Sequence, residues 1–484
     1  MKLLSPAVAF LFCIQLSFLS AAEAPVEKEG KDARPNIILV MSDDQGWGDV
    51  GYNGHPILKT PNLDTAAREG LRFDRFYAAA PSCSPTRASV LTGRNPNRMG
   101  VFSWGHAIRP QEVTIAEVLK REGYVTGHFG KWHLGSVKAD SPVNPGNNGF
   151  DRWVSAPNFY DNNPTMSDQG REVKMKGESS AIAVDAALDW MKDAVKGDAP
   201  IFAVIWFGSP HLPYNSDSAN ETLYSDQRKK MREYLGELTG IDNAYGRLRD
   251  SLTEFGIRDN TLLWYTSDNG ALRKVGSSGG ARGGKHSVYE GGLLVPAVLE
   301  WPAVIKEHKS SPVRCTTNDM FPTIMDIVGV PLDNFPVLDG ISLMPLITGN
   351  VSVRPEPLGF WNVNIPGQFR QSDGIVKKVL PSFENWSDNK IERVTKRVEA
   401  VPKQKWPLDV YRGHAAWISG DWKLHRFSMS EGQKVKWELY NLASDPKENH
   451  DVSKQYPEIV NELQVDFEAW LKSVVQSLNG EDYQ

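Results

Sequence analysis

The chain has 484 residues, of which 40% are hydrophobic and 23% are charged, so it is long enough for two domains or one large domain with a buried core. Its net charge of −5 argues against a nucleic-acid-binding protein. Its three cysteines are too few for a disulfide framework in a protein of this length.

The first residues have the pattern of a secretory signal peptide. Lys2 supplies positive charge, residues 7–19 form the apolar run, and small residues follow at 20–22. The apolar run is too short to span a bilayer. We therefore predict a signal peptide over 1–22, a flexible charged leader over 23–34, and no membrane span. Such a protein is secreted or periplasmic, or lysosomal or extracellular in a eukaryote.

The first predicted strand covers residues 36–41, which after Asn36 are continuously apolar, as in a strand buried on both faces of a parallel sheet. Asp43 and Asp44 follow it, and carboxylate oxygens are the ligands that Ca²⁺ and Mg²⁺ prefer. An isolated Asp-Asp pair is more often a solvated turn, so the pair alone does not define a metal site. Residues 60–64 are then predicted to open a helix with Leu63, Ala66, Ala67 and Leu71 on one face.

A short helix is predicted beside Cys83. Ser84 is a suitable N-cap, Pro85 is a suitable first helical residue, and Gly93 can end the helix. Cys83 would then lie at the positive end of the helix dipole, with Arg87 one turn further along the same side. A lone cysteine is more often a small core residue, so the functional interpretation depends on the rest of this stretch.

A second strand is predicted over 124–129, followed by Lys131 and His133. In an extended segment these two side chains point to the same side, which suits anion binding and proton transfer. Taken alone, the segment is better explained by a surface lysine beside a packed histidine. Residues 136–180 are rich in Pro, Asn, Asp and Gly, and we predict that most of them form a long surface loop.

That loop contains residues suited to a sugar-binding pocket, although an ordinary loop explains them equally well: Trp153, Asn158, Tyr160 and Asp161. A helix is predicted over 181–191, and a third buried strand over 201–207 leads to His211. Prolines on both sides of this histidine stiffen its loop.

A helical stretch over 225–255 precedes a fourth buried strand, 261–266. Asp268 and Asn269 follow this strand and add two more oxygen ligands. A glycine-rich loop then leads to Lys285. Its glycines let the backbone approach an anion closely, and the lysine supplies charge. A further strand is predicted over 293–300.

Each of the four buried strands thus ends in a short polar motif. Ligands of open α/β sheets bind beyond the carboxyl ends of the strands, so we expect these motifs to share one exposed rim.

The sequence pattern changes after residue 355. Strands at 417–427 and 435–442 are predicted to form an antiparallel hairpin, and an amphipathic helix begins at Pro457. We therefore predict a catalytic α/β domain over 35–355 and a C-terminal α+β subdomain over 356–484.

The motifs together resemble those of the type I sulfatases of the alkaline-phosphatase-like superfamily. The resemblance rests on C-S-P-T-R at 83–87 with L-T-G-R after it, and on G-K-W-H-L-G, P-H-L-P-Y, S-D-N-G, G-G-K and Y-E-G-G. It spans residues 36 to about 300 and continues more weakly in D-W-K-L at 421–424 and E-L-Y-N-L at 438–442. The loop after Phe150 follows no family motif, so the pocket for the leaving group is not covered.

The resemblance implies a large, mixed, mostly parallel sheet flanked by helices, with a smaller C-terminal antiparallel sheet and helix. It implies that a formylglycine-generating or sulfatase-maturating enzyme oxidises Cys83 to formylglycine, an aldehyde. It also implies a Ca²⁺ site, in preference to Mg²⁺, formed by residue 83 together with Asp43, Asp44, Asp268 and Asn269.

The reaction implied by the resemblance begins when a hydroxyl of the hydrated aldehyde attacks sulfur. The second hydroxyl, with His133 as base, then releases sulfate. Lys131 and Lys285 would hold sulfate oxygens, His211 would protonate the leaving oxygen, and Arg87 would anchor residue 83.

Three functions remain open at this stage. The first is hydrolysis of a sulfate monoester, on a sulfated carbohydrate or, as the runner-up, on a sulfated phenol. The second is hydrolysis of phosphate or phosphonate esters, because the same groups hold any tetrahedral anion. The third is non-catalytic binding of sulfated glycans, if Cys83 is never converted.

Overall fold

The computed structural model describes residues 34–349, 351–363, 405–428 and 434–483. The predicted signal peptide and all but the last residue of the predicted leader lie outside the described residues, and the described residues group into one unit. Within the described residues, no helix is long and apolar enough to cross a bilayer. The predicted division at residue 355 stays a prediction.

Most strands belong to one large sheet. They are β1 (Asn36–Ser42), β2 (Leu71–Tyr77), β3 (Val125–Lys131), β4 (Arg152–Ala156), β5 (Thr165–Asp168), β6 (Arg171–Lys174), β7 (Ile201–Trp206), β8 (Thr261–Ser267), β9 (Leu294–Glu300), β10 (Lys309–Ser311) and β11 (Cys315–Thr316). Their order is β10-β2-β9-β8-β1-β7-β3-β4-β5-β6, and β11 also pairs with β2. The central strands β8, β1, β7, β3 and β4 are mutually parallel, as predicted, whereas β9 runs antiparallel to β8 and β2.

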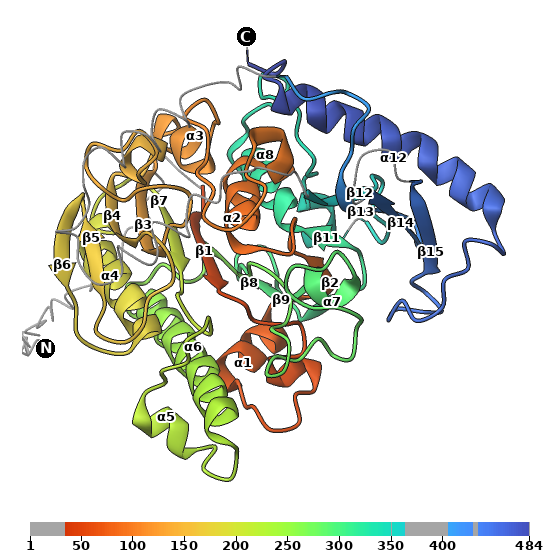
Figure 1. Cartoon of the computed structure of the whole chain (residues 1–484). Helices are drawn as coiled ribbons and strands as arrows, with labels where there is room; N and C mark the ends of the chain where they lie inside the picture. Colours follow the sequence, from red (N-terminus) through yellow and green to blue (C-terminus); the bar gives the residue numbers. More distant parts are fainter. Residues whose placement is uncertain (1–33, 350, 364–404, 429–433, 484) are drawn as a thin grey trace, which may run out of the picture. The chain divides into compact units, whose positions relative to one another are not determined.

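Helices flank this sheet (Figure 1). They are α1 (Pro61–Glu69), α2 (Cys83–Thr92), α3 (Ile115–Arg121), α4 (Ser179–Ala194), α5 (Ser218–Thr222), α6 (Lys229–Glu254), α7 (Glu290–Leu293), α8 (Met320–Val328) and α9 (Met344–Ile347), with 3₁₀ turns η1 (Gly51–Asn53), η2 (Pro96–Met99), η3 (Gly146–Asn148) and η4 (Thr317–Asp319).

Strand β1 shows why the central strands are continuously apolar. Ile37, Leu39 and Met41 belong to the core formed with α2, α3 and α8. Ile38 and Val40 belong to the core formed with α1, α4 and α6. Because successive side chains of a strand point to opposite faces, a sheet covered on both faces needs apolar residues at every position.

The C-terminal sheet has the order β12 (Leu358–Val363), β13 (Gly413–Ser419), β14 (Trp422–Ser428) and β15 (Lys436–Asn441), with all neighbours antiparallel. One face packs on the long helix α12 (Pro457–Leu478), through residues such as Trp417 and Leu424. The other face, which includes Ala416 and Ile418, packs on residues of β2 and the segment around α7. Figure 1 shows β13, β14, β15 and α12 in blue. The predicted small antiparallel sheet with a helix is confirmed.

Several predicted boundaries were wrong. Leu71 begins β2 instead of belonging to the helix, because α1 stops at Glu69 and β2 pairs with β9 and β10. The predicted loop 136–180 contains β4, β5 and β6, which are too short, at four or five residues, to show a clear periodicity. The predicted strand 417–427 is two strands joined at Gly420, which has a φ of 55°.

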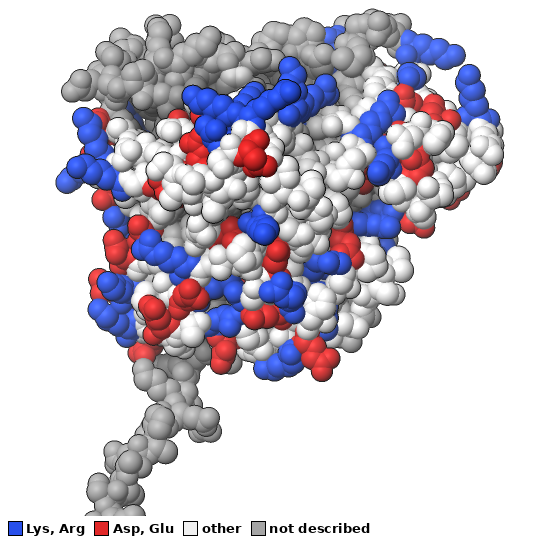
Figure 2. Space-filling view, turned by 90° about the horizontal axis from the view of Figure 1, so that it is seen from below, with Lys and Arg blue, Asp and Glu red and all other residues white. Residues whose placement is uncertain are grey.

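Acidic and basic side chains are interspersed on the face seen in Figure 2. This mixture agrees with the small net charge of the sequence. A continuous basic surface, which nucleic-acid binding requires, is not seen on that face of the described residues.

Candidate active site

Two pairs of predicted metal ligands lie side by side at the carboxyl ends of neighbouring strands. Asp43 and Asp44 follow β1, and Asp268 and Asn269 follow β8, which is parallel to β1 with Ser42 opposite Ser267. All four ligand side chains are buried. The expectation of an exposed rim was therefore wrong. The strand-end segments are bonded together instead: the Asp44 N–H donates to Asp268 Oδ1 at 3.0 Å.

Each of the three carboxylates has a cationic partner. The pairs are Lys131 Nζ with Asp43 Oδ2 at 2.6 Å, Lys285 Nζ with Asp44 Oδ1 at 2.5 Å, and Arg87 Nη2 with Asp268 Oδ2 at 2.7 Å. Buried charges persist in proteins only when they are paired in this way. The structure thus brings together residues that lie as far apart as 43 and 285 in the sequence.

The pairing leaves three buried oxygens without a hydrogen-bond partner: Asp43 Oδ1, Asp44 Oδ2 and Asn269 Oδ1. Leaving a buried acceptor unsatisfied is costly, so such a cluster indicates a missing positive group. Oxygen donors of this kind fit a hard divalent cation such as Ca²⁺ or Mg²⁺. The donor set therefore fits the metal that the sequence predicted.

Cys83 is the first residue of α2, and Ser82 is its N-cap. The prediction of Ser84 as the N-cap was wrong, because the Ser84 hydroxyl instead accepts the Gly105 N–H at 2.8 Å. The predicted helix end is confirmed, since Gly93 has a left-handed φ of 71°.

The Cys83 thiol faces the acidic cluster. Ligand atoms of Cys83, Asp43 and Asp268 all lie within 4.8 Å of one another. Burial raises the pKa of the thiol, and this effect outweighs the opposite influence of Lys131 and Lys285. The positive end of the helix dipole therefore does not make this residue a reactive thiolate, which is the nucleophilic form of cysteine.

Arg87 is fully buried and links several parts of the cluster. Besides its bond to Asp268, it donates from Nη1 to the Lys131 carbonyl at 3.2 Å. Its guanidinium carbon lies 5.0 Å from the centre of the Trp206 ring. Arg87 thus fixes the groups around residue 83.

The two predicted histidines differ in their surroundings. His133 is buried with both ring nitrogens unpartnered, and burial lowers its pKa well below the usual range. His211 Nε2 lies 3.6 Å from Asp44 Oδ2, and its side chain is 20% exposed. Burial, together with Lys285, lowers its pKa to about 3. Burial thus disfavours the protonated form of both rings.

A model described as Sulfatase matches residues 35–330 of the sequence. The chain belongs to the sulfatase family. N-acetylgalactosamine-6-sulfatase of Canis lupus familiaris is 34% identical over 384 residues, which cover 71% of this chain and 71% of that protein. Arylsulfatase A of Homo sapiens is 35% identical over 364 residues, which cover 68% of this chain and 70% of that protein. This sulfatase is accordingly a sulfuric ester hydrolase.

A solved structure has a similar fold. The crystal structure of Ps i-CgsB in complex with k-i-k-neocarrahexaose superposes with a TM-score of 0.75 at 24% identity, covering 91% of this chain and 93% of that chain. At that level of identity the likeness concerns the fold alone. It confirms the predicted fold class for this sulfatase.

The four residues suggested for a sugar pocket differ in burial and in their contacts in this sulfatase. Trp153 lies in β4 and is part of the core, so its assignment to a sugar pocket was wrong. Tyr160 is also buried, at 4% exposure. Asn158 accepts the Phe159 N–H at 2.8 Å, and Asp161 is half-buried.

Sequence reasoning missed Phe159. Its ring stacks on His211, with ring centres 4.3 Å apart and an angle of 16° between the planes. Phe159 lies in the loop that follows no family motif, so no pattern in the sequence marked it. It is placed to hold the His211 ring in one orientation.

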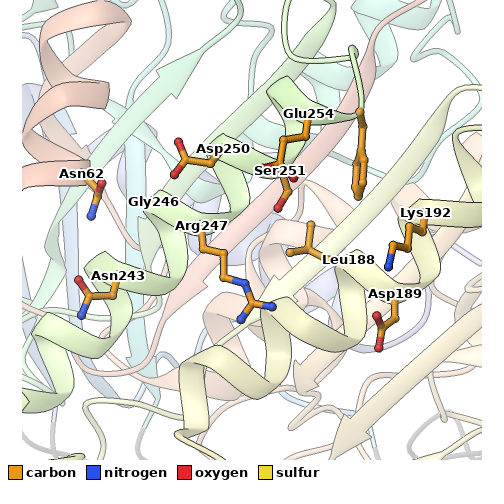
Figure 3. Close-up of a pocket in the computed structure, with 11 residues that line it drawn as sticks. Asn62, Leu188, Asp189, Lys192, Asn243, Gly246, Arg247, Asp250, Ser251 and Glu254 are labelled. Atoms are coloured by element: carbon orange, nitrogen blue, oxygen red, sulfur yellow. The ribbon is translucent and has the colours of Figure 1, made fainter. Parts of the chain in front are cut away.

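A cavity of about 550 Å³ lies elsewhere, between α4 and α6. Figure 3 shows that polar side chains from both helices line it, among them Asp189, Lys192, Arg247 and Asp250. These residues lie on the last turns of helices that lead to the amino ends of β7 and β8. The cavity is therefore not the site that holds Asp43, Cys83 and the other predicted residues.

Proposed function

We propose that this sulfatase hydrolyses a sulfate monoester of a carbohydrate at the cluster formed by Cys83, Asp43, Asp44, Asp268 and Asn269. The observation that carries the proposal is the set of buried, unpartnered oxygens directly beside Cys83. The relative named N-acetylgalactosamine-6-sulfatase supports a sugar sulfate, and arylsulfatase A supports a sulfated phenol as the second candidate.

The cation, Ca²⁺ in preference to Mg²⁺, would be held by Asp43, Asp44, Asp268, Asn269 and the modified residue 83. When bound, it polarises a sulfate oxygen. Formylglycine, made from Cys83 by a formylglycine-generating or sulfatase-maturating enzyme, supplies the nucleophile that a buried neutral thiol does not.

Lys131 and Lys285 hold the oxygens of the bound sulfate. In this structure each lysine donates to one carboxylate oxygen, Asp43 Oδ2 or Asp44 Oδ1, and the other oxygen of each carboxylate is unpartnered and would be available to the cation. An ammonium group has three donors, so each lysine would keep hydrogens available for the anionic substrate. Donors fixed in advance in a water-poor site stabilise developing charge strongly.

His211 protonates the leaving oxygen from Nε2. Its Nδ1 lies 2.6 Å from the Leu212 carbonyl, which can only accept, so Nδ1 carries a hydrogen and Nε2 is the nitrogen that exchanges a proton. Bound sulfate adds negative charge near His211 and offsets Lys285, which raises the pKa of the ring. Both ring nitrogens of His133 are unpartnered and burial lowers its pKa, which favours the neutral form that a base for residue 83 requires.

The modification can be tested directly. Protein made in a host with the maturation enzyme is expected to carry an aldehyde at residue 83, because the C-S-P-T-R motif is intact. Mass spectrometry of the peptide containing residue 83 measures this. Protein that is active and carries only the thiol would exclude the proposed nucleophile.

The reaction class is tested by comparing release of sulfate and phosphate from matched esters. We expect faster release of sulfate. Faster release of phosphate or phosphonate would favour the alternative hydrolase. Binding of sulfated glycans with no release of either anion would favour a non-catalytic binder.

We also propose that the protein is exported, to the periplasm or the medium or to a lysosome or the extracellular space in a eukaryote, because residues 1–22 have the pattern of a signal peptide.

A further inference from the structure

Three sequence motifs have no part in the proposed reaction. They are Y-E-G-G at 289–292, D-W-K-L at 421–424 and E-L-Y-N-L at 438–442. The structure brings them together where the C-terminal sheet packs on the segment around α7. This segment continues the glycine-rich loop that carries Lys285, and we refer to residues 279–292 together as the loop.

Strand alternation explains which side chains reach this contact. Leu424 of β14 and Leu439 of β15 face α12. Their neighbours Lys423, His425 and Glu438 therefore point to the opposite face, toward the α7 segment. This face carries charge although its lysine and histidine are fully buried.

Glu290 is the centre of a buried network. Lys423 Nζ donates to Glu290 Oε1 at 2.7 Å, and the Tyr77 hydroxyl donates to Glu290 Oε2 at 2.9 Å. The backbone N–H of Glu290 donates to Glu448 Oε2 at 2.6 Å. Glu448 Oε1 in turn lies 3.1 Å from Lys423 Nζ and 2.6 Å from His425 Nε2.

Further bonds fix the loop on both sides of Lys285. Arg282 donates to the Tyr440 hydroxyl at 2.9 Å and to the Glu448 carbonyl at 3.0 Å. The Tyr289 hydroxyl donates to Glu438 at 2.6 Å. All of these partners belong to the C-terminal sheet or to the segment that follows it.

The other side of the loop faces the site. Lys285 Nζ lies 2.5 Å from Asp44, and its backbone N–H donates to the Ala271 carbonyl at 2.9 Å. The next residue, His286, donates its N–H to the Pro81 carbonyl at 2.8 Å, just before Cys83. The loop therefore lies between the buried network and the acidic cluster.

We propose that the C-terminal sheet sets the position of Lys285, and that Lys423, acting through Glu290 and Glu448, is a positioning residue for sulfate binding. The inference rests on the proposed role of Lys285 as a residue that holds sulfate. Without Lys423, two buried carboxylates lose their cationic partner and the Glu290 segment must rearrange. A displacement of about 1 Å near a reacting group can lower the rate roughly a hundredfold.

A double-mutant cycle tests this. Lys423→Met is expected to lower kcat/KM roughly tenfold to a hundredfold, equally for an aryl sulfate and a sulfated monosaccharide, and to weaken inhibition by inorganic sulfate. Added to Lys285→Ala, the same change is expected to cause little further loss, because displacing a lysine that is absent has no effect. The measurements are kcat/KM, the inhibition constant of sulfate and the melting temperature.

Arg354→Met is the matched control. It breaks another buried ion pair, with Asp319 at 2.7 Å. These two side chains also bond to the backbone of Thr316, Ile341 and Glu356, which lie outside the loop at 279–292. We expect it to lower the melting temperature, to leave sulfate inhibition unchanged, and to add its effect to that of Lys285→Ala.

Additive losses for Lys423→Met and Lys285→Ala would overturn the inference and leave Lys423 a residue of the fold only. An unchanged rate for Lys285→Ala alone would overturn the proposed function of Lys285, and the inference with it. If Lys423→Met does not yield folded protein, Tyr289→Phe replaces it in the cycle. That change removes only the hydroxyl bonded to Glu438. Additive losses with Lys285→Ala, or an unchanged rate for Lys285→Ala alone, would overturn the inference in the same way.

Discussion

Asp268→Asn is expected to abolish Ca²⁺ binding and to lower kcat/KM for any sulfate ester roughly a thousandfold, because a metal supplies several kcal/mol of charge stabilisation and ~1.4 kcal/mol is a factor of ten in rate. The amide keeps the shape of the side chain but removes its charge. It also forces an N–H₂ group toward either Arg87 or the Asp44 N–H, both of which donate to Asp268.

Calorimetric titration with Ca²⁺, the melting temperature and kcat/KM measure the effect. The asparagine variant is preferable to alanine because Asp268 is buried and an amide oxygen can still accept a hydrogen bond from Arg87, whereas alanine offers the buried cation no acceptor at this position. A variant that keeps its activity after treatment with a chelator would contradict the metal assignment.

Asp49→Asn is the matched control. Asp49 is equally buried after β1, and it accepts from the Gly46 and Ser277 N–H groups and the Tyr234 hydroxyl. None of these partners belongs to the acidic cluster. We expect this variant to lose some stability and to bind Ca²⁺ as the parent does.

The central strands could be predicted from the sequence because burial on both faces leaves a continuous apolar run. Strands β1, β7 and β8 are each almost entirely buried, and each was found. Strand β2 was missed because its half-buried positions are charged residues, Arg72, Asp74 and Arg75, so that only part of it is apolar. Strands β5 and β6, at the edge of the sheet, were missed because each has only four residues, too few to show a clear periodicity.

The residues of the acidic cluster could also be predicted from the sequence, because the strand ends of a parallel sheet meet at one edge. The cationic partners of these carboxylates could not be predicted. That Lys285 pairs with Asp44, and Arg87 with Asp268, depends on how loops distant in sequence fold over the strand ends. The same is true of Phe159, whose stacking on His211 follows from one loop conformation.

His211→Ala is expected to lose far more rate on a sulfated sugar than on an activated aryl sulfate. A sugar hydroxyl leaves poorly without a proton, and general acid catalysis is worth roughly a hundredfold or more. A nitrophenolate is already acidic and needs little protonation. Replacing His211 therefore removes an effect that only the sugar substrate uses.

Lys285→Ala is the comparison variant, and kcat/KM for both variants on both substrates is the measurement. Lys285 holds sulfate oxygens, which the two substrates share, so we expect similar losses on both. A Phe159→Leu variant tests the same role of His211, because it keeps His211 Nε2 but removes the ring that stacks on it. It should reproduce part of the loss on the sugar and little on the aryl sulfate. Equal losses on the two substrates for His211→Ala would exclude it as the acid and leave it a residue that binds sulfate.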